Sequence, residues 1–75
     1  MTKPNEYLYH GDHITLGQFL KASNLVQTGG EGKVMLTSGA IMVNGEQELR
    51  RGRKLRQGDL VQFGRQLWLL VSAPL

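Results

Sequence analysis

The sequence contains no cysteine, and this absence excludes two kinds of site. Without cysteine the chain can form neither a disulfide nor a thiolate metal centre, so nothing in it requires an oxidising compartment. A cytoplasmic protein is therefore expected. The 75 residues suffice for one small domain, near the size at which a single core only just outweighs the entropy lost on folding. A domain of this size offers little material for a deep catalytic cleft.

Long hydrophobic runs are also missing. The longest, "LWLLV" at residues 67–71, is far too short to span a bilayer. The first 13 residues, "MTKPNEYLYHGDH", have no apolar core of the kind found in signal peptides. We therefore expect a soluble protein that acts without a membrane.

Positive charge is scarce outside one short segment. The chain has nine Lys and Arg residues against six Asp and Glu, a net charge of +3. Five of the nine lie in residues 50–56, here called the basic segment: Arg50, Arg51, Arg53, Lys54 and Arg56. The rest of the chain is net negative. Such a concentration is typical either of a surface that binds an anionic partner or of a merely solvated loop.

A capping motif predicts the start of a first helix. In "TLGQ", the Thr15 hydroxyl can accept a hydrogen bond from the amide of Gln18, whose side chain can bond back to the Thr15 amide. The residues that follow at the spacing of one buried helix face are Leu16, Phe19, Leu20 and Ser23. Lys21 is expected on the opposite, exposed face.

A second capping motif, "TGGE", begins at Thr28 and pairs it with Glu31. The helix should carry the apolar residues 34–36 and end before Gly39. Each glycine in its first turn costs roughly 1 kcal/mol relative to alanine, so some other requirement must favour Gly29, Gly30 and Gly32. Either a phosphate or another backbone approaches closely, or the glycines let one helix pack tightly on the other.

From residue 40 the hydrophobic pattern alternates, which predicts strands. "AIMVNGEQEL" has a tight turn at Asn44-Gly45, and later strands at 60–63 and 67–71 follow turns at 58–59 and 64–65. This order predicts an α+β fold in which two short N-terminal helices pack on a small, mainly antiparallel, strongly twisted sheet. We expect residues 1–13 to form an N-terminal segment and residues 14–75 the domain itself.

The N-terminal segment includes Tyr7–Tyr9, which has the pattern of a short edge strand. Alternation along residues 67–71 places Leu67, Leu69 and Val71 on one face and Trp68 and Leu70 on the other. One of these faces must stay partly exposed unless something covers it. We expect residues 7–9 to cover it; the alternative is that Trp68 is a stacking platform for a base.

Together these motifs resemble the S-four RNA-binding domain, or alpha-L motif. The similar stretches are "TGGEGKVMLTSGAIMVNG" at residues 28–45, "GDLV" at 58–61 and "TLGQFL" at 15–20. The chain departs from the family at Thr15, Gly17 and Gly29, where members often have arginine or aspartate. It looks most like the small stand-alone bacterial members, which are thought to bind ribosomal RNA or assembling large ribosomal subunits.

The resemblance implies that the two helices and the basic segment share an RNA-facing surface. Arginine predominates in the segment, and its planar fork suits bidentate contacts with phosphates and base edges. Gly52 would let the loop approach a backbone closely, and Leu55 should point inward and anchor it. The residues expected to bind RNA are Lys21, Thr28, Gly29, Gly30, Lys33, Arg50, Arg51, Arg53, Lys54 and Arg56.

The expected partner is structured RNA, ribosomal RNA or the assembling large ribosomal subunit in particular, bound by a monomer that needs no cofactor. "TGGEGK" is not a phosphate-binding P-loop, because Gln27 and Val34 stand where that motif needs glycine and Ser or Thr. "HGDH", residues 10–13, supplies His10, Asp12 and His13, but no further His or Cys completes a metal site. No catalytic residues are expected.

Three other functions remain open at this stage. The first alternative is a protein-interaction module that docks on an acidic or apolar partner surface. Next is DNA binding, since two consecutive short helices can resemble a helix-turn-helix, although the glycine-rich second helix is a poor reader of the major groove. An enzyme is the weakest alternative, because the histidines have no recognisable nucleophile or triad partner.

Overall fold

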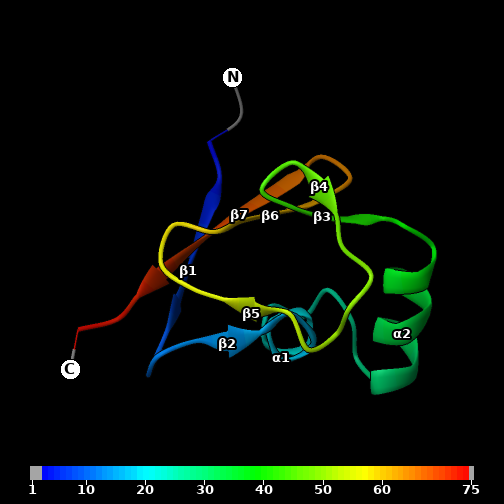
Figure 1. The fold of residues 1–75 in the computed structure, drawn as a ribbon, viewed down its shortest axis with the longest axis horizontal. Helices are drawn as coiled ribbons and strands as arrows, with labels where there is room; N and C mark the ends of the chain where they lie inside the picture. Colours follow the sequence, from blue (N-terminus) through cyan, green and yellow to red (C-terminus); the bar gives the residue numbers. More distant parts are fainter. Residues whose placement is uncertain (1–2, 75) are drawn as a thin grey trace.

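A computed structural model describes residues 3–74. Residues 1, 2 and 75 belong to the two expected segments, 1–13 and 14–75, but lie outside the described part of the chain. The elements in chain order are β1 (Asn5–Tyr9), β2 (Ile14–Thr15), α1 (Leu16–Ala22), α2 (Gly29–Thr37), β3 (Ile41–Val43), β4 (Glu46–Gln47), β5 (Lys54–Leu55), β6 (Leu60–Phe63) and β7 (Gln66–Ser72). The α+β class is confirmed. The expectation that the helices come first is wrong, because β1 and β2 precede α1 (Figure 1).

The main sheet has five strands in the order β1-β7-β6-β3-β4. Three of its four strand pairs are antiparallel, as the turns predict, but β1 runs parallel to β7, with Asn5 opposite Trp68 and Tyr9 opposite Ser72. β1 therefore lies beside β7 and not across its face, so the expected covering of that face is wrong. Leu67, Leu69 and Val71 stay partly exposed.

The core lies between the other face of this sheet and α1. Leu16, Phe19 and Leu20 are fully buried, which confirms the apolar face expected for the first helix. The Phe19 ring packs edge-on against Tyr7 from β1 and Trp68 from β7, with ring centroids 5.3 and 5.9 Å apart. Edge-to-face pairs of this kind add to the stabilisation from burial alone. Trp68 therefore serves as a packing residue at the core.

Two turns predicted from sequence bond to each other. Asn44 and Gly45 adopt the positive φ angles, 53° and 84°, that their hairpin requires. The Asn44 side chain donates to Asp59 Oδ1 at 3.0 Å and accepts from the Leu60 amide at 2.9 Å. This ties the first hairpin to the turn at residues 58–59.

A second, two-stranded sheet positions the basic segment. β2 and β5 pair antiparallel, with Ile14 opposite Leu55 and Thr15 opposite Lys54. Leu55 is completely buried, which confirms that it anchors this part of the chain. The pairing holds the basic segment directly next to the start of α1.

Within residues 3–74, neither helix has the length and apolar character needed to cross a membrane.

Candidate nucleic-acid interface

The first turn of α1 meets the loop between β4 and β5, residues 48–53, called the β4–β5 loop. The predicted capping box is complete: the Gln18 amide donates to Thr15 Oγ1 at 3.2 Å, and the Thr15 amide donates to Gln18 Oε1 at 3.0 Å. The amides of Leu16 and Gly17 donate to the carbonyl oxygens of Arg53 and Arg51 at 2.8 and 2.9 Å. All four of these amides are therefore satisfied, and the loop is fixed to the helix by its backbone.

Glu48, at the start of the β4–β5 loop, is buried inside a basic surface, with only 5% of the residue exposed. Its carboxylate accepts from the amides of Leu49 and Arg50 at 3.0 and 3.1 Å. It also accepts two hydrogen bonds from the Arg50 guanidinium, at 3.1 and 3.2 Å, and one from Arg53 at 2.9 Å. One acid thus organises most of this loop from within.

These contacts keep Glu48 charged. The hydrogen bonds from the Arg50 side chain, and then those from the Arg50 backbone and Arg53, lower the pKa of Glu48 to about 2. Because this pKa lies below its unfolded value of 4.5, the stabilisation is fully present above pH 4.5 and is lost as the pH falls toward 2. Contact with Glu48 also raises the pKa of Arg50. The pair stays ionised at neutral pH.

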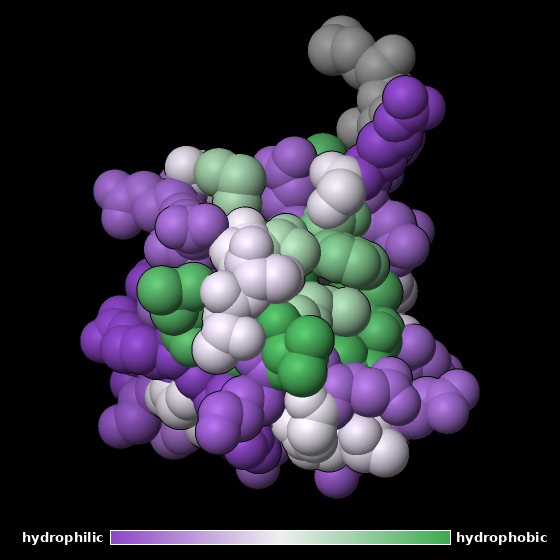
Figure 2. All heavy atoms as spheres, turned by 90° about the vertical axis from the view of Figure 1, so that its right-hand side faces the viewer, coloured by the Kyte–Doolittle hydropathy of each residue, from purple (hydrophilic) through white to green (hydrophobic). Residues whose placement is uncertain are grey.

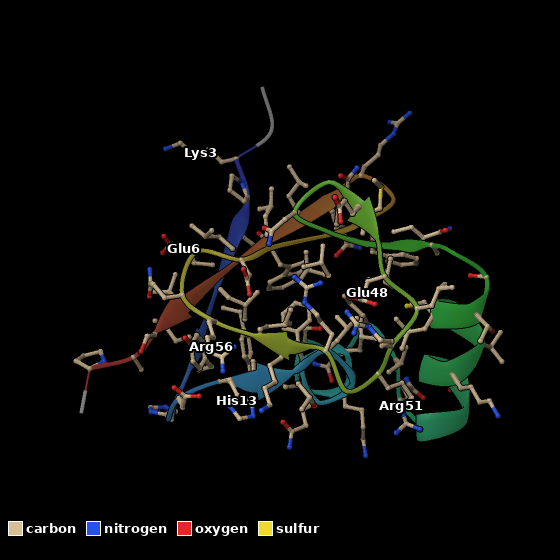
Figure 3. The ribbon with its side chains drawn as sticks, in the orientation of Figure 1. Lys3, Glu6, His13, Glu48, Arg51 and Arg56 are labelled. Carbon is tan, nitrogen blue, oxygen red and sulfur yellow. The ribbon has the colours of Figure 1, made fainter. Side chains whose placement is uncertain are left out.

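Arg51 lies between the first turns of the two helices. A Cβ added at Gly17 would lie 3.6 Å from Arg51 Nε, and one added at Gly29 would lie 3.8 Å from Arg51 Nη2. Figure 3 shows Arg51 where the β4–β5 loop comes close to α2. Arg51 therefore occupies the space beside Gly17 and Gly29, two of the positions at which the chain departs from the pattern of the family that its motifs resemble.

A shallow depression adjoins Arg51 on the α1 side. Its lining comprises Thr15, Gly17, Gln18, Lys21, Arg51 and Gly52. Lys21, expected only from the helix periodicity, is exposed and shares this depression with Arg51. The structure thus brings together Lys21, Arg51 and the first turn of α2.

The start of α2 differs from the motif read in the sequence. Thr28 caps the helix as predicted, accepting from the Glu31 amide at 3.1 Å. The reciprocal bond of the predicted capping box, from the Thr28 amide to Glu31, is wrong, because the Glu31 carboxylate accepts from the Gln27 amide instead, at 3.4 Å. The N–H groups of Gly29 and Gly30 are the first two of the helix, where no intrahelical acceptor is available.

The glycines of α2 are not required by packing. A Cβ at Gly30 would lie 3.8 Å from the Thr28 hydroxyl, and one at buried Gly32 would lie 3.7 Å from Val26 Cγ2, both ordinary contact distances. Alanine would therefore fit at either position. Of the two alternatives left open by the sequence, tight helix packing does not explain these residues.

The remaining predicted residues are less closely grouped. Lys33 on α2 and Lys54 on β5 are exposed. Arg56 lies at the other end of β5 from Arg51, near His13, and its guanidinium is 3.4 Å from the Asp12 carboxylate (Figure 3). A hydrogen bond with His13, and then the charge of Arg56, lower the pKa of Asp12. Among residues 3–74, no three His, Asp or Glu side chains converge as metal ligands would.

The face of the molecule that carries α2 is not uniformly polar. Figure 2 shows apolar and weakly polar residues in its centre, with hydrophilic residues around them. The large hydrophobic residues exposed in the structure include Val34 on α2, at 68%, and Leu49 in the β4–β5 loop, at 53%. Close approach to this face is therefore not limited by long charged side chains at its centre.

Sequence reasoning missed Glu48, whose carboxylate accepts five hydrogen bonds in this region. The available signal was an acid two residues before Arg50 and five before Arg53, within an otherwise basic stretch. Such spacing does not reveal burial, because no regular helix or strand fixes residues 48–53 relative to the core.

The model of a family described as "S4 domain" matches residues 7–70. A curated protein of Bacillus subtilis (strain 168), named "Probable ribosome maturation protein RlbA", is 51% identical over 50 residues, which cover 67% of this chain and 70% of the relative. The S4 domain is the S-four family that the sequence motifs resemble.

Proposed function

This chain belongs to the S4 domain family, and on that premise we propose that it is a non-catalytic RNA-binding protein. The proposed partner is structured RNA, in particular ribosomal RNA or an assembling large ribosomal subunit. The relative named as a ribosome maturation protein supports a role connected with ribosomes. In this proposal residues 14–75 form the binding domain, after an N-terminal segment at 1–13, and the protein acts in the cytoplasm as a monomer without a cofactor.

One observation carries the proposal: Arg51 lies between the first turns of α1 and α2 and next to the depression shared with Lys21. An RNA phosphate bound there would meet the Arg51 guanidinium and, on the α2 side, the amides of Gly29 and Gly30. Thr28 would border the same site. Backbone amides at a helix start and a guanidinium fork both favour an anionic oxygen.

The other predicted cations would make secondary contacts with neighbouring phosphates: Lys33, Arg50, Arg53, Lys54 and Arg56. Three of them, Arg50, Arg53 and Arg56, also pair with acids of the protein, so they would contribute less than Arg51. Folded RNA is a better fit than a plain duplex, because the deep, narrow major groove of A-form RNA is closed to side chains. Shape and backbone contacts would then dominate recognition.

The test compares Arg51→Ala with Arg65→Ala. Both changes remove one exposed arginine, but Arg65 lies in the turn between β6 and β7, away from α1 and α2. Fluorescently labelled, folded fragments of large-subunit ribosomal RNA would be titrated with each protein over a salt series. Arg51→Ala should weaken binding about tenfold and make the log-log salt slope shallower by about 0.7–0.9, as expected for one lost phosphate contact.

Arg65→Ala should change binding much less. Equal effects of the two variants would mean that binding follows net charge and not the site between the helices. Absence of salt-dependent binding by the wild-type protein would refute the proposed function.

A second candidate is a protein-interaction module. The observation that favours it is the partly exposed sheet face with Leu67, Leu69 and Val71, next to Leu8, which is 58% exposed. Leu8 is opposite Val71 in the register of β1 and β7, so the two side chains share one face. A complex that is insensitive to salt and is lost on Leu8→Glu would support this alternative.

A further inference from the structure

The five cations of the basic segment are not equivalent. Arg50 and Arg53 form ion pairs with Glu48, and Arg56 pairs with Asp12. Within the described residues 3–74, Arg51 and Lys54 form no ion pair with an acid. The cations therefore divide into a set engaged by the protein itself and a set available to a partner.

Glu48 fixes the β4–β5 loop from its inner side. Its carboxylate bonds to the amides of the next two residues and to two guanidinium groups, one of them five residues later. From the other side, the amides at the start of α1 hold the carbonyl groups of Arg51 and Arg53. Arg51 is thus the residue of this loop whose backbone is fixed while its side chain carries no internal salt bridge.

We propose that Glu48 is a positioning residue of the RNA interface: it pairs with Arg50 and Arg53, fixes the β4–β5 loop, and thereby directs Arg51 into the space between α1 and α2. The inference rests on the proposed function and adds to it how binding is made selective. A preformed loop with two of its arginines occupied favours folded RNA of matching shape over polyanions in general. Glu48 acts through Arg51 and need not contact RNA.

If only net charge mattered, loss of the Glu48 carboxylate would strengthen RNA binding. Replacing Glu48 by glutamine raises the net charge by one and frees two arginines, so binding to any RNA should become tighter. If Glu48 positions Arg51, folded RNA should instead bind more weakly, while a flexible single strand should bind at least as well. The two explanations therefore differ in the sign of one effect.

The experiment uses two probes and a matched control. The probes are folded fragments of large-subunit ribosomal RNA and single-stranded poly(U), titrated at one fixed salt concentration. Glu48→Gln is compared with Glu46→Gln, which makes the same change of charge at an exposed site in β4. The ratio of affinities for folded RNA over poly(U) should fall about tenfold in Glu48→Gln, the size of effect expected when one well-placed arginine contact is lost. In Glu46→Gln the ratio should stay unchanged.

A charge-conserving variant covers the case in which Glu48→Gln does not fold. Glu48→Asp keeps the net charge but withdraws the carboxylate by one methylene group, so it should lower affinity for folded RNA and leave poly(U) binding unchanged. Circular dichroism and thermal unfolding would confirm that each protein tested is folded.

The outcomes separate this inference from the proposed function. If Arg51→Ala weakens binding but both Glu48 variants keep the wild-type affinity ratio, Glu48 is not a positioning residue and the proposed function stands. If Glu48→Gln binds both probes more tightly, as Glu46→Gln would, net charge alone decides and the inference is wrong. If the wild-type protein binds neither probe, the proposed function fails, and the inference fails with it.

Discussion

The two helices, only six residues apart in the chain, are built for different purposes. α1 has seven residues, a complete capping box and three fully buried side chains. α2 has nine residues, yet its buried residues are only Gly32 and Leu36, and Val34 is 68% exposed. Three of the first four residues of α2 are glycine. α1 is thus optimised for packing and local stability, and α2 is not.

This difference indicates that α1 stabilises the core, whereas α2 mainly provides exposed surface. A glycine within a helix costs roughly 1 kcal/mol relative to alanine, and alanine would fit at Gly30 and Gly32. The lower helix propensity of α2 therefore has no cause within the described residues. Close approach of an RNA backbone, as proposed above, would favour a helix start without side chains.

The largest expected effect contrasts the packing of the two helices. Phe19→Ala should lower the free energy of unfolding by about 3–5 kcal/mol, because it removes a fully buried ring between Tyr7 and Trp68. Val34→Ala, at an exposed position of α2, should change it by less than about 0.5 kcal/mol. Urea denaturation followed by tryptophan fluorescence measures both. Similar losses for the two variants would show that α2 supports the fold as much as α1 does.

An intermediate effect is expected at the helix caps. Thr15→Ala should cost about 1 kcal/mol, because it removes the hydroxyl that caps α1 and leaves only one half of the capping box. Thr28→Ala should cost less, since Glu31 bonds to Gln27 and the reciprocal half of the box is missing. Thermal unfolding of the two variants provides the comparison. A greater loss for Thr28→Ala would contradict the ranking of the two helices.

A third, smaller effect on stability should have the opposite sign. Gly30→Ala should raise the free energy of unfolding by about 0.5–1 kcal/mol, because alanine favours the helix and meets no close neighbour. The same change should weaken binding to folded large-subunit ribosomal RNA, since the added methyl group would hold the RNA backbone away from the backbone of α2. Denaturation and RNA titration on one protein sample measure both quantities.

Gly32→Ala is the matched control, because this glycine is buried and faces Val26. It should leave RNA affinity unchanged. If Gly30→Ala stabilises the protein and binds RNA as well as the wild type, the first turn of α2 is not a contact surface.

Local signals in the sequence were sufficient to predict much of the fold. The cap of α1, the apolar face with Phe19, the end of α2 just before Gly39 and the turn at Asn44-Gly45 all depend on residues a few positions apart. The parallel pairing of β1 with β7 and the two-residue pairing of β2 with β5 depend on residues far apart in the chain. A strand of two residues, such as β2 or β5, is too short to show the alternating pattern from which strands are predicted.

The same limit applies to the candidate site. The sequence identified the cations of the basic segment but could not show that Arg50 and Arg53 face Glu48 or that Arg56 faces Asp12. It also could not show that Arg51 lies beside Gly17 and Gly29, since that contact unites three separate elements. The sequence therefore shows where the charged residues are, but only the fold shows which of them are already paired with acids of the protein.

The parallel pairing of β1 with β7 has a consequence for biosynthesis. β1 is synthesised before the other elements described in residues 3–74, yet the strand beside it in the sheet, β7, is the last of these elements, with Asn5 opposite Trp68. Closing so long a loop is slow compared with forming a local helix or hairpin. Until β7 has emerged, Tyr7 has no neighbouring strand, and Phe19 has no Trp68 to pack against. The nascent chain therefore completes its core only after nearly all of the domain has been synthesised.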